Sequence, residues 1–269
     1  MKKVLLIGYG RFGKILFEKL RAMSEVNVTI ATHNYQKHLA GADWAVIATP
    51  VDTHTAIAGE CLAAGLNVFS EKPLGEHPYE VEELILKAQK AGKRLYIDDV
   101  FCYRKEFATL KSITPISSVD FLLQKYGTFN ATILVAHVYH DLYLLVDLVG
   151  FGKIENIIIT KKETPLEKDR VDILEFSFMY NGILVTGSYD RTRQEKIKKI
   201  TLNKNTVWLN NRIIIDSREM ATPKHDAIAD MLTQVIEEKA DFTHNNKLAL
   251  EATRLLAVIA GKNKMKRFT

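Results

Sequence analysis

The chain has 269 residues, enough for one large domain or two of ordinary size. Hydrophobic residues make up 47% and charged residues 26%, and no apolar run reaches the roughly 18–20 residues of a membrane helix, so we expect a cytoplasmic protein without a membrane partner. The net charge of +5 comes from scattered lysines, which favours small anionic ligands and predicts no nucleic-acid surface. Cys61 and Cys102 lack metal-type spacing, so we expect free thiols and no metal site.

The first hundred residues alternate between short apolar runs and helical patterns. Strands are expected at 3–8, 26–32, 44–49, 67–70 and 94–99, and helices at 11–23, 53–65 and 78–92. Strands that are apolar throughout, interleaved with helices, indicate a parallel sheet covered on both faces. The pattern predicts a doubly wound α/β domain over residues 1–105.

Beyond residue 105 the pattern changes to a long apolar helix, then strands, then two closing helices. The helices are expected at 131–150, 224–239 and 246–261, and extended segments at 116–127, 154–160, 171–180, 182–190, 196–202, 206–210 and 212–216. A helix followed by strands with short connections predicts an α+β domain over residues 106–269, with an open, mostly antiparallel sheet.

The stretch GYGRFG, residues 8–13, lies between the first strand and the first helix. Gly8 permits a tight turn, Gly10 lets the backbone approach a pyrophosphate, and Gly13 allows close helix–strand packing. The phosphates would bind at the helix N-terminus. The motif predicts a Rossmann domain that binds a dinucleotide through the residues of this turn: Gly8, Tyr9, Gly10, Arg11, Phe12 and Gly13.

The end of the second strand bears on which nucleotide is bound. An NAD-binding domain normally places Asp or Glu there to hold the ribose hydroxyls. This chain has Thr32, His33 and Asn34, and Lys37 follows. Without a carboxylate nothing repels a 2′-phosphate, so Thr32 and His33 favour NADP over NAD. The alternative is that these residues only begin a loop.

Two further turns are expected on the same sheet edge, since the carboxyl ends of parallel strands meet there. Thr49 and Pro50 leave the third strand and His54 follows at the start of a helix, so we expect this turn to line the nicotinamide side of the cofactor, although His54 could equally contact no ligand. Glu71 and Lys72 leave the next strand, before a proline that restricts the conformation of the lysine. Lysine near a cofactor can accept or release a substrate proton.

These stretches together resemble the glucose–fructose oxidoreductase/inositol dehydrogenase family (Gfo/Idh/MocA). The resemblance rests on TPVDTH at 49–54, AGECLAAGLNVFSEKPL at 58–74, DVFCYR at 99–104 and HDLYLLVDLVG at 140–150. It implies hydride transfer between a nicotinamide cofactor and a carbinol carbon of a sugar, cyclitol or nucleotide sugar. It also implies that Lys72 and His140 assist proton transfer and hold the substrate, that Arg104 contacts it, and that the chain forms a homodimer or higher homo-oligomer.

The chain departs from the family pattern at Ala136, where members commonly have Asp four residues before the histidine. Tyr143 and His137, each three residues from His140, could substitute as a catalytic and a substrate-binding group. Two alternatives therefore stay open. One is a nucleotide-binding sensor or subunit without turnover, and the other is a reductase of an imine or tetrapyrrole.

Overall fold

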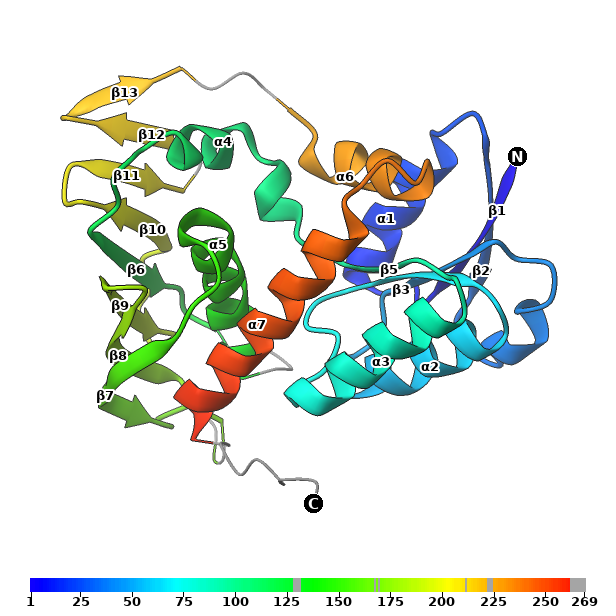
Figure 1. Ribbon diagram of the computed structural model, residues 1–269, viewed down its shortest axis with the longest axis horizontal. Coiled ribbons are helices and arrows are strands. Elements are labelled where there is room, and N and C mark those ends of the chain that lie inside the picture. Colours follow the sequence, from blue (N-terminus) through cyan, green and yellow to red (C-terminus); the bar gives the residue numbers. More distant parts are fainter. Residues whose placement is uncertain (128–131, 167, 169, 211, 222–224, 262–269) are drawn as a thin grey trace. The chain divides into compact units, whose positions relative to one another are not determined.

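The computed structural model describes residues 1–127, 132–166, 168, 170–210, 212–221 and 225–261. The chain forms two compact units, each built on its own sheet (Figure 1). Unit 1 consists of Met1–Tyr103 and Asp226–Thr253, and unit 2 of Arg104–His225 and Arg254–Thr269. No helix within the described part of the chain combines the length and the apolar character needed to cross a bilayer.

Unit 1 contains a five-stranded parallel sheet in the order β2-β1-β3-β4-β5. Its strands are β1 (Lys2–Ile7), β2 (Val26–Ala31), β3 (Trp44–Ile47), β4 (Asn67–Ser70) and β5 (Leu95–Ile97). Its helices are α1 (Arg11–Arg21), α2 (His54–Ala63), α3 (Pro78–Lys90) and α6 (Ala227–Ile236). The expected doubly wound α/β fold is confirmed, and the strands lie where the apolar runs predict them.

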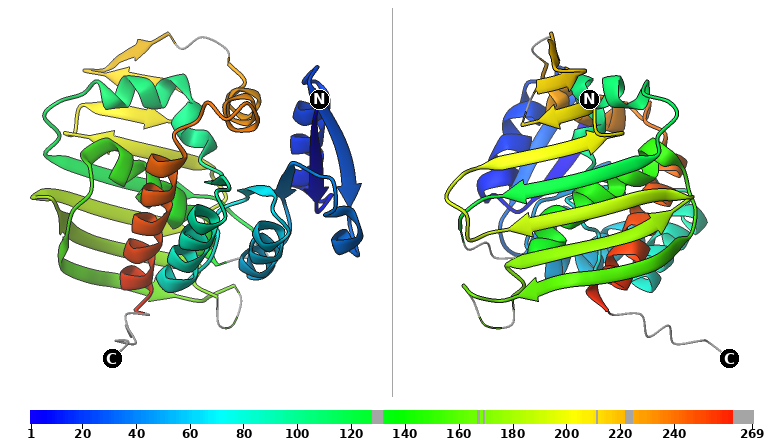
Figure 2. Two further views of the ribbon diagram at one scale, coloured as in Figure 1. Left: turned by 45° about the vertical axis from the view of Figure 1, so that its right-hand side comes forward. Right: turned by 90° about the vertical axis from the view of Figure 1, so that its left-hand side faces the viewer.

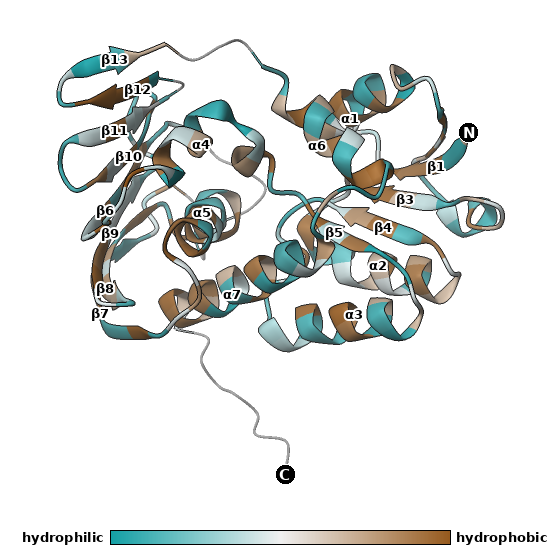
Figure 3. Cartoon of the chain, turned by 45° about the horizontal axis from the view of Figure 1, so that its top comes forward, coloured by the Kyte–Doolittle hydropathy of each residue, from teal (hydrophilic) through white to brown (hydrophobic). Residues whose placement is uncertain are grey.

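The two faces of this sheet are covered by different helices, as period-2 alternation requires. Val4 and Leu6 of β1 point into a core with Leu16 and Leu20 of α1. Helix α6 lies beside α1 on that face, whereas α2 and α3 lie together on the other (Figures 1 and 3). Both faces of the central strands are therefore covered, and the ends of the strands are left for ligands.

The segment Asp226–Thr253 corrects the expected division into 1–105 and 106–269. Its apolar side chains complete the core of unit 1: Met231, Leu232, Val235, Ile236 and Phe242. The side-chain amide of Asn245, in α7 (Phe242–Ala260), also donates to the carbonyl oxygen of Ile97 at 2.8 Å and accepts from its N–H at 2.9 Å. Because β5 is an edge strand, this amide satisfies backbone groups that no neighbouring strand reaches.

Unit 2 contains an eight-stranded sheet in the order β13-β12-β11-β10-β6-β9-β8-β7 (Figure 2). Its strands are β6 (Ser118–Gln124), β7 (Ile154–Glu163), β8 (Ile173–Tyr180), β9 (Ile183–Asp190), β10 (Ile197–Leu202), β11 (Thr206–Leu209), β12 (Arg212–Ile215) and β13 (Arg218–Met220). Neighbours are antiparallel except for β6 and β9, which confirms the expected mostly antiparallel sheet. Strand β13 and helix α4 (Lys105–Lys111) have no counterpart among the expected elements.

The helix expected over 131–150 is not uniform. A π-helical turn covers Leu134–Val138, and the α-helix proper, α5 (Tyr139–Val149), follows and ends at Gly150 with φ 82°. Ala131 lies outside the described residues. Helix α5 is hydrophobic along most of its length (Figure 3), and its buried residues cover the sheet of unit 2. The π-helical turn changes the angular spacing of the residues immediately before His140.

Candidate active site

Three turns lie next to one another at the carboxyl edge of the unit 1 sheet. Ile7 of β1 is in register with Ile47 of β3, which is in register with Ser70 of β4. The glycine turn follows β1, the Thr49-Pro50 turn follows β3, and the Glu71-Lys72 turn follows β4. In the order β2-β1-β3, the crevice between β1 and β3 is where a doubly wound sheet binds its ligand.

The three glycines of the first turn have three different surroundings. Gly8 has φ 95°, and a Cβ there would lie 2.5 Å from the carbonyl oxygen of Ala48. A Cβ on Gly13 would overlap the carbonyl oxygen of Gly8, whereas a Cβ on Gly10 would have nothing within 4 Å. The turn is thus closely packed beneath Gly8 and Gly13 and open above Gly10, as close approach of a pyrophosphate requires.

Helix α1 presents its N-terminus at this turn. Gly10 is its N-cap, no side chain caps it, and its first turn contains no acidic residue. The first N–H groups of a helix have no partner within the helix and attract anions. Tyr9 and Phe12 pack against the core of unit 1, and the Tyr9 ring meets Phe17 edge to face at 5.6 Å. The residues here fit a dinucleotide, with Tyr9 and Phe12 supporting the turn.

The segment after β2 is held in place from α2. The Glu60 carboxylate accepts from the Tyr35 hydroxyl at 2.7 Å and from Gln36 Nε2 at 3.1 Å. Burial first, and then the hydrogen bond to Glu60, raises the pKa of Tyr35. Thr32 and His33 remain exposed beside this fixed segment. Tyr35 and Gln36 are residues whose structural use the sequence does not reveal, because their partner lies on a different element.

His54 joins the second and third turns. Its ring is 2% exposed, with Nδ1 2.8 Å from the carbonyl oxygen of Pro73 and Nε2 2.8 Å from that of Thr49. Burial is the main cause that lowers the pKa of His54. Since both ring nitrogens face backbone carbonyls, His54 links the two turns, and its expected contact with the cofactor stays a prediction.

The Lys72 turn is accompanied by the buried carboxyl group of Asp98 and the partly exposed one of Glu71. The Lys72-Pro73 peptide bond is cis. Asp98 is 2% exposed and accepts from the Val100 N–H at 2.9 Å, and Glu71 follows the neighbouring strand. Burial, and then the neighbouring Glu71, raises the pKa of Asp98 to about 8, and burial raises the pKa of Glu71. Sequence reasoning missed Asp98, although a carboxylate that directly follows a buried strand was a usable signal.

In unit 2, the expected residues lie on or just before α5. Ala136, His137 and His140 are partly exposed, whereas Tyr143 is 3% exposed and its ring lies 6.3 Å from that of Tyr139. The burial of Tyr143 is that of a core side chain, so a catalytic role for it stays a prediction. Lys72 belongs to unit 1 and His140 to unit 2, and their joint action on one substrate likewise stays a prediction.

A buried carboxylate anchors α5 beside His140. Asp141 Oδ2 accepts from the Tyr189 hydroxyl of β9 at 3.0 Å, and its Oδ1 lies 3.1 Å from the Lys198 ammonium of β10. Burial first, and then Asp141, raises the pKa of Tyr189. Arg104, the first residue of unit 2, is partly exposed at the N-cap of α4. The sequence did not single out Asp141, whose role depends on strands far along the chain.

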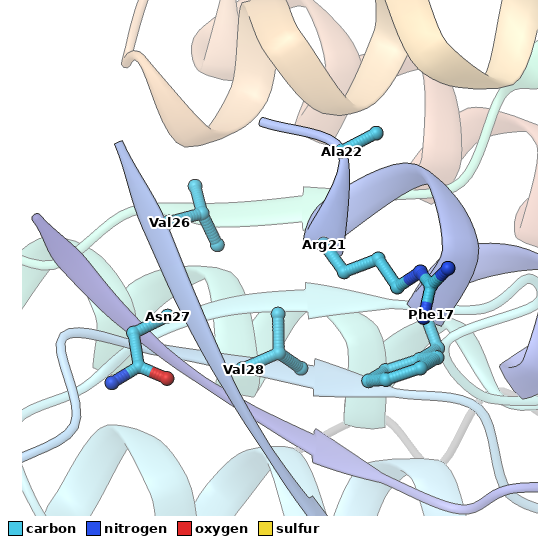
Figure 4. A pocket seen from close by; sticks show the side chains of 6 residues that line it. All are labelled: Phe17, Arg21, Ala22, Val26, Asn27 and Val28. Carbon is cyan, nitrogen blue, oxygen red and sulfur yellow. The ribbon is translucent and has the colours of Figure 1, made fainter. Parts of the chain in front are cut away.

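A surface pocket in unit 1 lies away from these groups, at the end of α1 and the start of β2 (Figure 4). It is lined by Phe17, Arg21, Ala22, Val26, Asn27 and Val28. This is the edge of the sheet opposite the glycine turn, and none of the expected site residues contributes to it. Among the residues that the structure describes, no group of three His, Cys, Asp or Glu side chains could hold a metal ion.

The sheet order, the glycine turn and the uncapped helix define a dinucleotide-binding Rossmann protein. Residues 15–98 match the model of the Gfo/Idh/MocA family, described as an oxidoreductase family with an NAD-binding Rossmann fold. The match confirms, over these residues, the resemblance seen in the sequence, the oxidoreductase class and the nicotinamide cofactor.

One curated relative is similar over a short segment. It is named "Putative UDP-kanosamine synthase oxidoreductase subunit", from Amycolatopsis mediterranei, and is 34% identical over 73 residues. The matched segment is 27% of this chain and spans 20% of the relative's length.

Solved structures share the fold over nearly the whole chain. The UDP-N-acetylglucosamine 3-dehydrogenase of Acidithiobacillus ferrooxidans has a TM-score of 0.84 at 17% identity, with 96% of each chain covered. GenD2 from gentamicin A biosynthesis, in complex with NAD, has a TM-score of 0.80 at 16% identity, covering 99% of this chain and 95% of its own. The biliverdin reductase of Synechocystis sp. PCC 6803, with biliverdin and NADP+, has a TM-score of 0.77 at 15% identity, covering 96% and 98%.

Proposed function

We propose that the protein is an NAD(P)-dependent oxidoreductase that transfers a hydride between nicotinamide and a carbinol or carbonyl carbon of a small polar substrate. The observation that carries this proposal is the adjacency of three turns at one sheet edge: the glycine turn, the Thr49-Pro50 turn and the Lys72 turn. When bound, the cofactor supplies the redox chemistry through its nicotinamide ring.

The residues of the chain bind the cofactor, orient the substrate and transfer its proton. The open backbone at Gly10 and the N-terminus of α1 hold the pyrophosphate, and His54 keeps the two other turns at a fixed spacing. Lys72 orients the substrate hydroxyl and accepts its proton during oxidation, or returns it during reduction. His140 is its proposed acid/base partner.

Nucleotide sugars are the substrate class that we favour within this reaction. The curated relative and the Acidithiobacillus structure are both named for UDP-linked amino sugars, which supports this class in preference to free cyclitols. The exposed Thr32 and His33, without a carboxylate nearby, support NADP as the preferred cofactor, with NAD as the alternative.

We also propose that the chain acts as a homodimer or higher homo-oligomer in a reducing compartment, such as the cytoplasm. Strand β7 lies at the edge of the unit 2 sheet and exposes the apolar side chains of Ile157, Ile158 and Ile159. Such exposure supports self-association. Cys61 and Cys102 are free thiols, which suits reducing conditions.

A substrate panel tests the proposal. Purified protein is incubated with NADP+ or NAD+ and with UDP-N-acetylglucosamine, UDP-glucose, free sugars and inositols, and formation of reduced nicotinamide is followed by absorbance. We expect turnover with at least one UDP-sugar and none with the free cyclitols. Turnover with cyclitols alone would contradict the substrate class.

A second candidate is a reductase of a linear tetrapyrrole. It is favoured by Ala136, which replaces the acidic residue of the family, and by the shared fold of the cyanobacterial biliverdin reductase. Reduction of biliverdin by NADPH, together with inactivity toward UDP-sugars, would support it. If the protein binds NADPH but turns over neither the sugars and inositols nor biliverdin, the remaining alternative, a nucleotide-binding sensor or subunit without turnover, is favoured.

A further inference from the structure

Two acidic side chains meet just beyond the ends of the neighbouring strands β4 and β5. The N–H of Asp98 donates to the carbonyl oxygen of Ser70 at 2.9 Å, so strand pairing extends to Asp98. Two residues earlier, Phe69 and Tyr96 are in register and their rings stack at 6.1 Å. Residues two apart in a strand lie on the same face, and neighbouring strands are about 4.8 Å apart. Glu71 and Asp98 are therefore the next side-by-side pair on the face of the sheet that carries Phe69 and Tyr96.

The placement of the two carboxyl groups limits the negative charge that the pair can hold. When two carboxyl groups share one site, ionisation of the first raises the pKa of the second, because like charges repel. Asp98 is 2% exposed, and its burial opposes a second negative charge. The Val100 N–H, 2.9 Å from Asp98 Oδ1, holds the Asp98 side chain in place. Burial, and then the neighbouring Glu71, raise the pKa of Asp98 to about 8, so Asp98 is the group of the pair that keeps its proton near neutral pH.

The pair lies next to the proposed proton-transfer residue. Lys72 follows Glu71 in the chain, and its positive charge partly offsets the rise that burial gives to the pKa of Glu71 and Asp98. One shared negative charge balances one ammonium group. Two negative charges would hold the lysine proton more tightly and slow its transfer.

Other titratable groups around the pair have partners of their own. Asp99, the next residue along, accepts from the Tyr96 hydroxyl at 2.7 Å. His54 is influenced by the charge of Lys72, and its ring nitrogens lie 2.8 Å from the carbonyl oxygens of Pro73 and Thr49, one of which accepts from the single N–H of the neutral ring. Glu71 and Lys72 are therefore the charged groups that act on Asp98.

We propose that Asp98 is a positioning residue that acts on Lys72 through Glu71, by sharing one proton with Glu71 and so limiting the negative charge beside the lysine. The proposal rests on the proposed function, in which Lys72 transfers the substrate proton. Its test needs neither substrate nor turnover, so a protein without redox activity would contradict the proposed function and leave this inference intact.

The first measurement is a carboxyl titration by NMR of protein labelled with ¹³C at the side-chain carboxyls. In the wild type, we expect one carboxyl of the pair to titrate well above the usual acidic range. In Asp98→Asn, which keeps the shape and a donor toward Glu71, only the Glu71 titration remains, and it moves to lower pH because no second carboxylate opposes it. Asp99→Asn is the matched control and leaves the pair unchanged.

The second measurement is the rate at which Lys72 is acylated as a function of pH, quantified by mass spectrometry. Above the titration of the pair, the wild type has two negative charges beside Lys72, and Asp98→Asn has one. The lysine therefore releases its proton more readily in the variant, and its reactivity profile moves to lower pH by about one pH unit. We expect Asp99→Asn to leave the reactivity profile of Lys72 unchanged. A general loss of structure would change the profile in both variants.

Two results would overturn the inference. One is a wild-type pair in which both carboxyls titrate in the ordinary acidic range, and the other is an unchanged Lys72 profile in Asp98→Asn. If Asp98→Asn does not fold, Glu71→Gln removes the other carboxyl of the pair. It must then move the Lys72 profile in the same direction, and an unchanged profile counts equally against the proposal.

Discussion

The imidazole Nδ1 of His54 and the carbonyl oxygen of Pro73 lie 2.8 Å apart, which ties the start of α2 to the turn that carries Lys72. The neutral ring has a single N–H, so His54→Ala leaves one backbone carbonyl, that of Pro73 or Thr49, without its donor, and we expect it to lower the free energy of unfolding by about 1–3 kcal/mol. Thermal unfolding followed by circular dichroism measures this effect. Unchanged stability would contradict the positioning role.

The same histidine gives stability a pH dependence. Burial lowers the pKa of His54, so below about pH 6.5 the unfolded chain binds a proton that the folded protein does not. Its contribution to stability is therefore complete above that pH and is lost as the pH falls toward the lowered folded pKa. We expect the stability loss between pH 7 and pH 5 to be smaller in His54→Ala than in the wild type, measured by the shift of the unfolding midpoint.

The glycine turn offers a matched pair of substitutions. Gly10→Ala adds a methyl group into open space, so we expect normal folding and NADPH binding weakened by about tenfold or more, since the methyl occupies the approach of the pyrophosphate. Gly13→Ala overlaps the carbonyl oxygen of Gly8, so we expect a loss of stability as well. Fluorescence titration and thermal unfolding separate the two effects. Tight NADPH binding by Gly10→Ala would place the pyrophosphate elsewhere.

Removal of the lysine amine tests the proton transfer. We expect Lys72→Ala to lower turnover by about 10²-fold or more while NADPH affinity stays close to that of the wild type. Lys90→Ala, at an exposed position at the end of α3, is the control for loss of a positive charge from unit 1. Equal turnover in Lys72→Ala and the wild type would remove Lys72 from the mechanism.

Cofactor preference should respond to charge at the end of β2. Thr32→Asp restores the carboxylate that NAD-binding domains carry there, which repels a 2′-phosphate and binds the ribose hydroxyls. We expect NADPH affinity to fall about tenfold or more and NADH affinity to rise. Separate titrations with the two cofactors measure this. A wild type that already prefers NADH by more than about tenfold would show that Thr32 and His33 have been misread.

Unit 2 contains a buried ion pair whose disruption should be costly. Arg191 and Asp172 are both fully buried, with Nη2 3.2 Å from Oδ1. Arg191→Met leaves a buried carboxylate without its cation, so we expect a loss of about 3–5 kcal/mol in urea unfolding. The exposed pair Arg212–Glu219 is the control, and Arg212→Met should cost about 1 kcal/mol or less. Similar losses of stability in both variants would contradict the expectation that burial makes the Arg191–Asp172 pair costly to break.

Much of unit 1 could be predicted because its information is local. Strands such as β1 and β4 are continuous apolar runs, and each helix between them shows helical periodicity, so the order of elements alone fixed the fold class. The glycine turn and Lys72 could be placed for the same reason, since carboxyl ends of parallel strands share one edge. Their roles were inferred from residue type and position.

The remaining features depend on contacts between distant segments. The periodicity of α6 shows that one face is apolar but not which sheet it covers, so its place in unit 1 could not be predicted. The pairing of Asp98 with Glu71 requires the register of β4 and β5, and the anchoring of Asp141 requires β9 and β10. The π-helical turn before His140 could not be predicted, because a run of apolar residues contains no sequence signal that distinguishes a π-helix from an α-helix.

The discontinuity of unit 1 affects how the chain is synthesised and how it can be divided. A ribosome that has released the first 103 residues has delivered the whole parallel sheet but not Met231, Leu232 or Phe242, which close its core. The nascent sheet must therefore wait, partly uncovered, until more than half of the polypeptide has followed. An expression plasmid that stops after residue 105 would yield an aggregation-prone fragment, whereas one that splices 226–253 onto that fragment restores the missing cover.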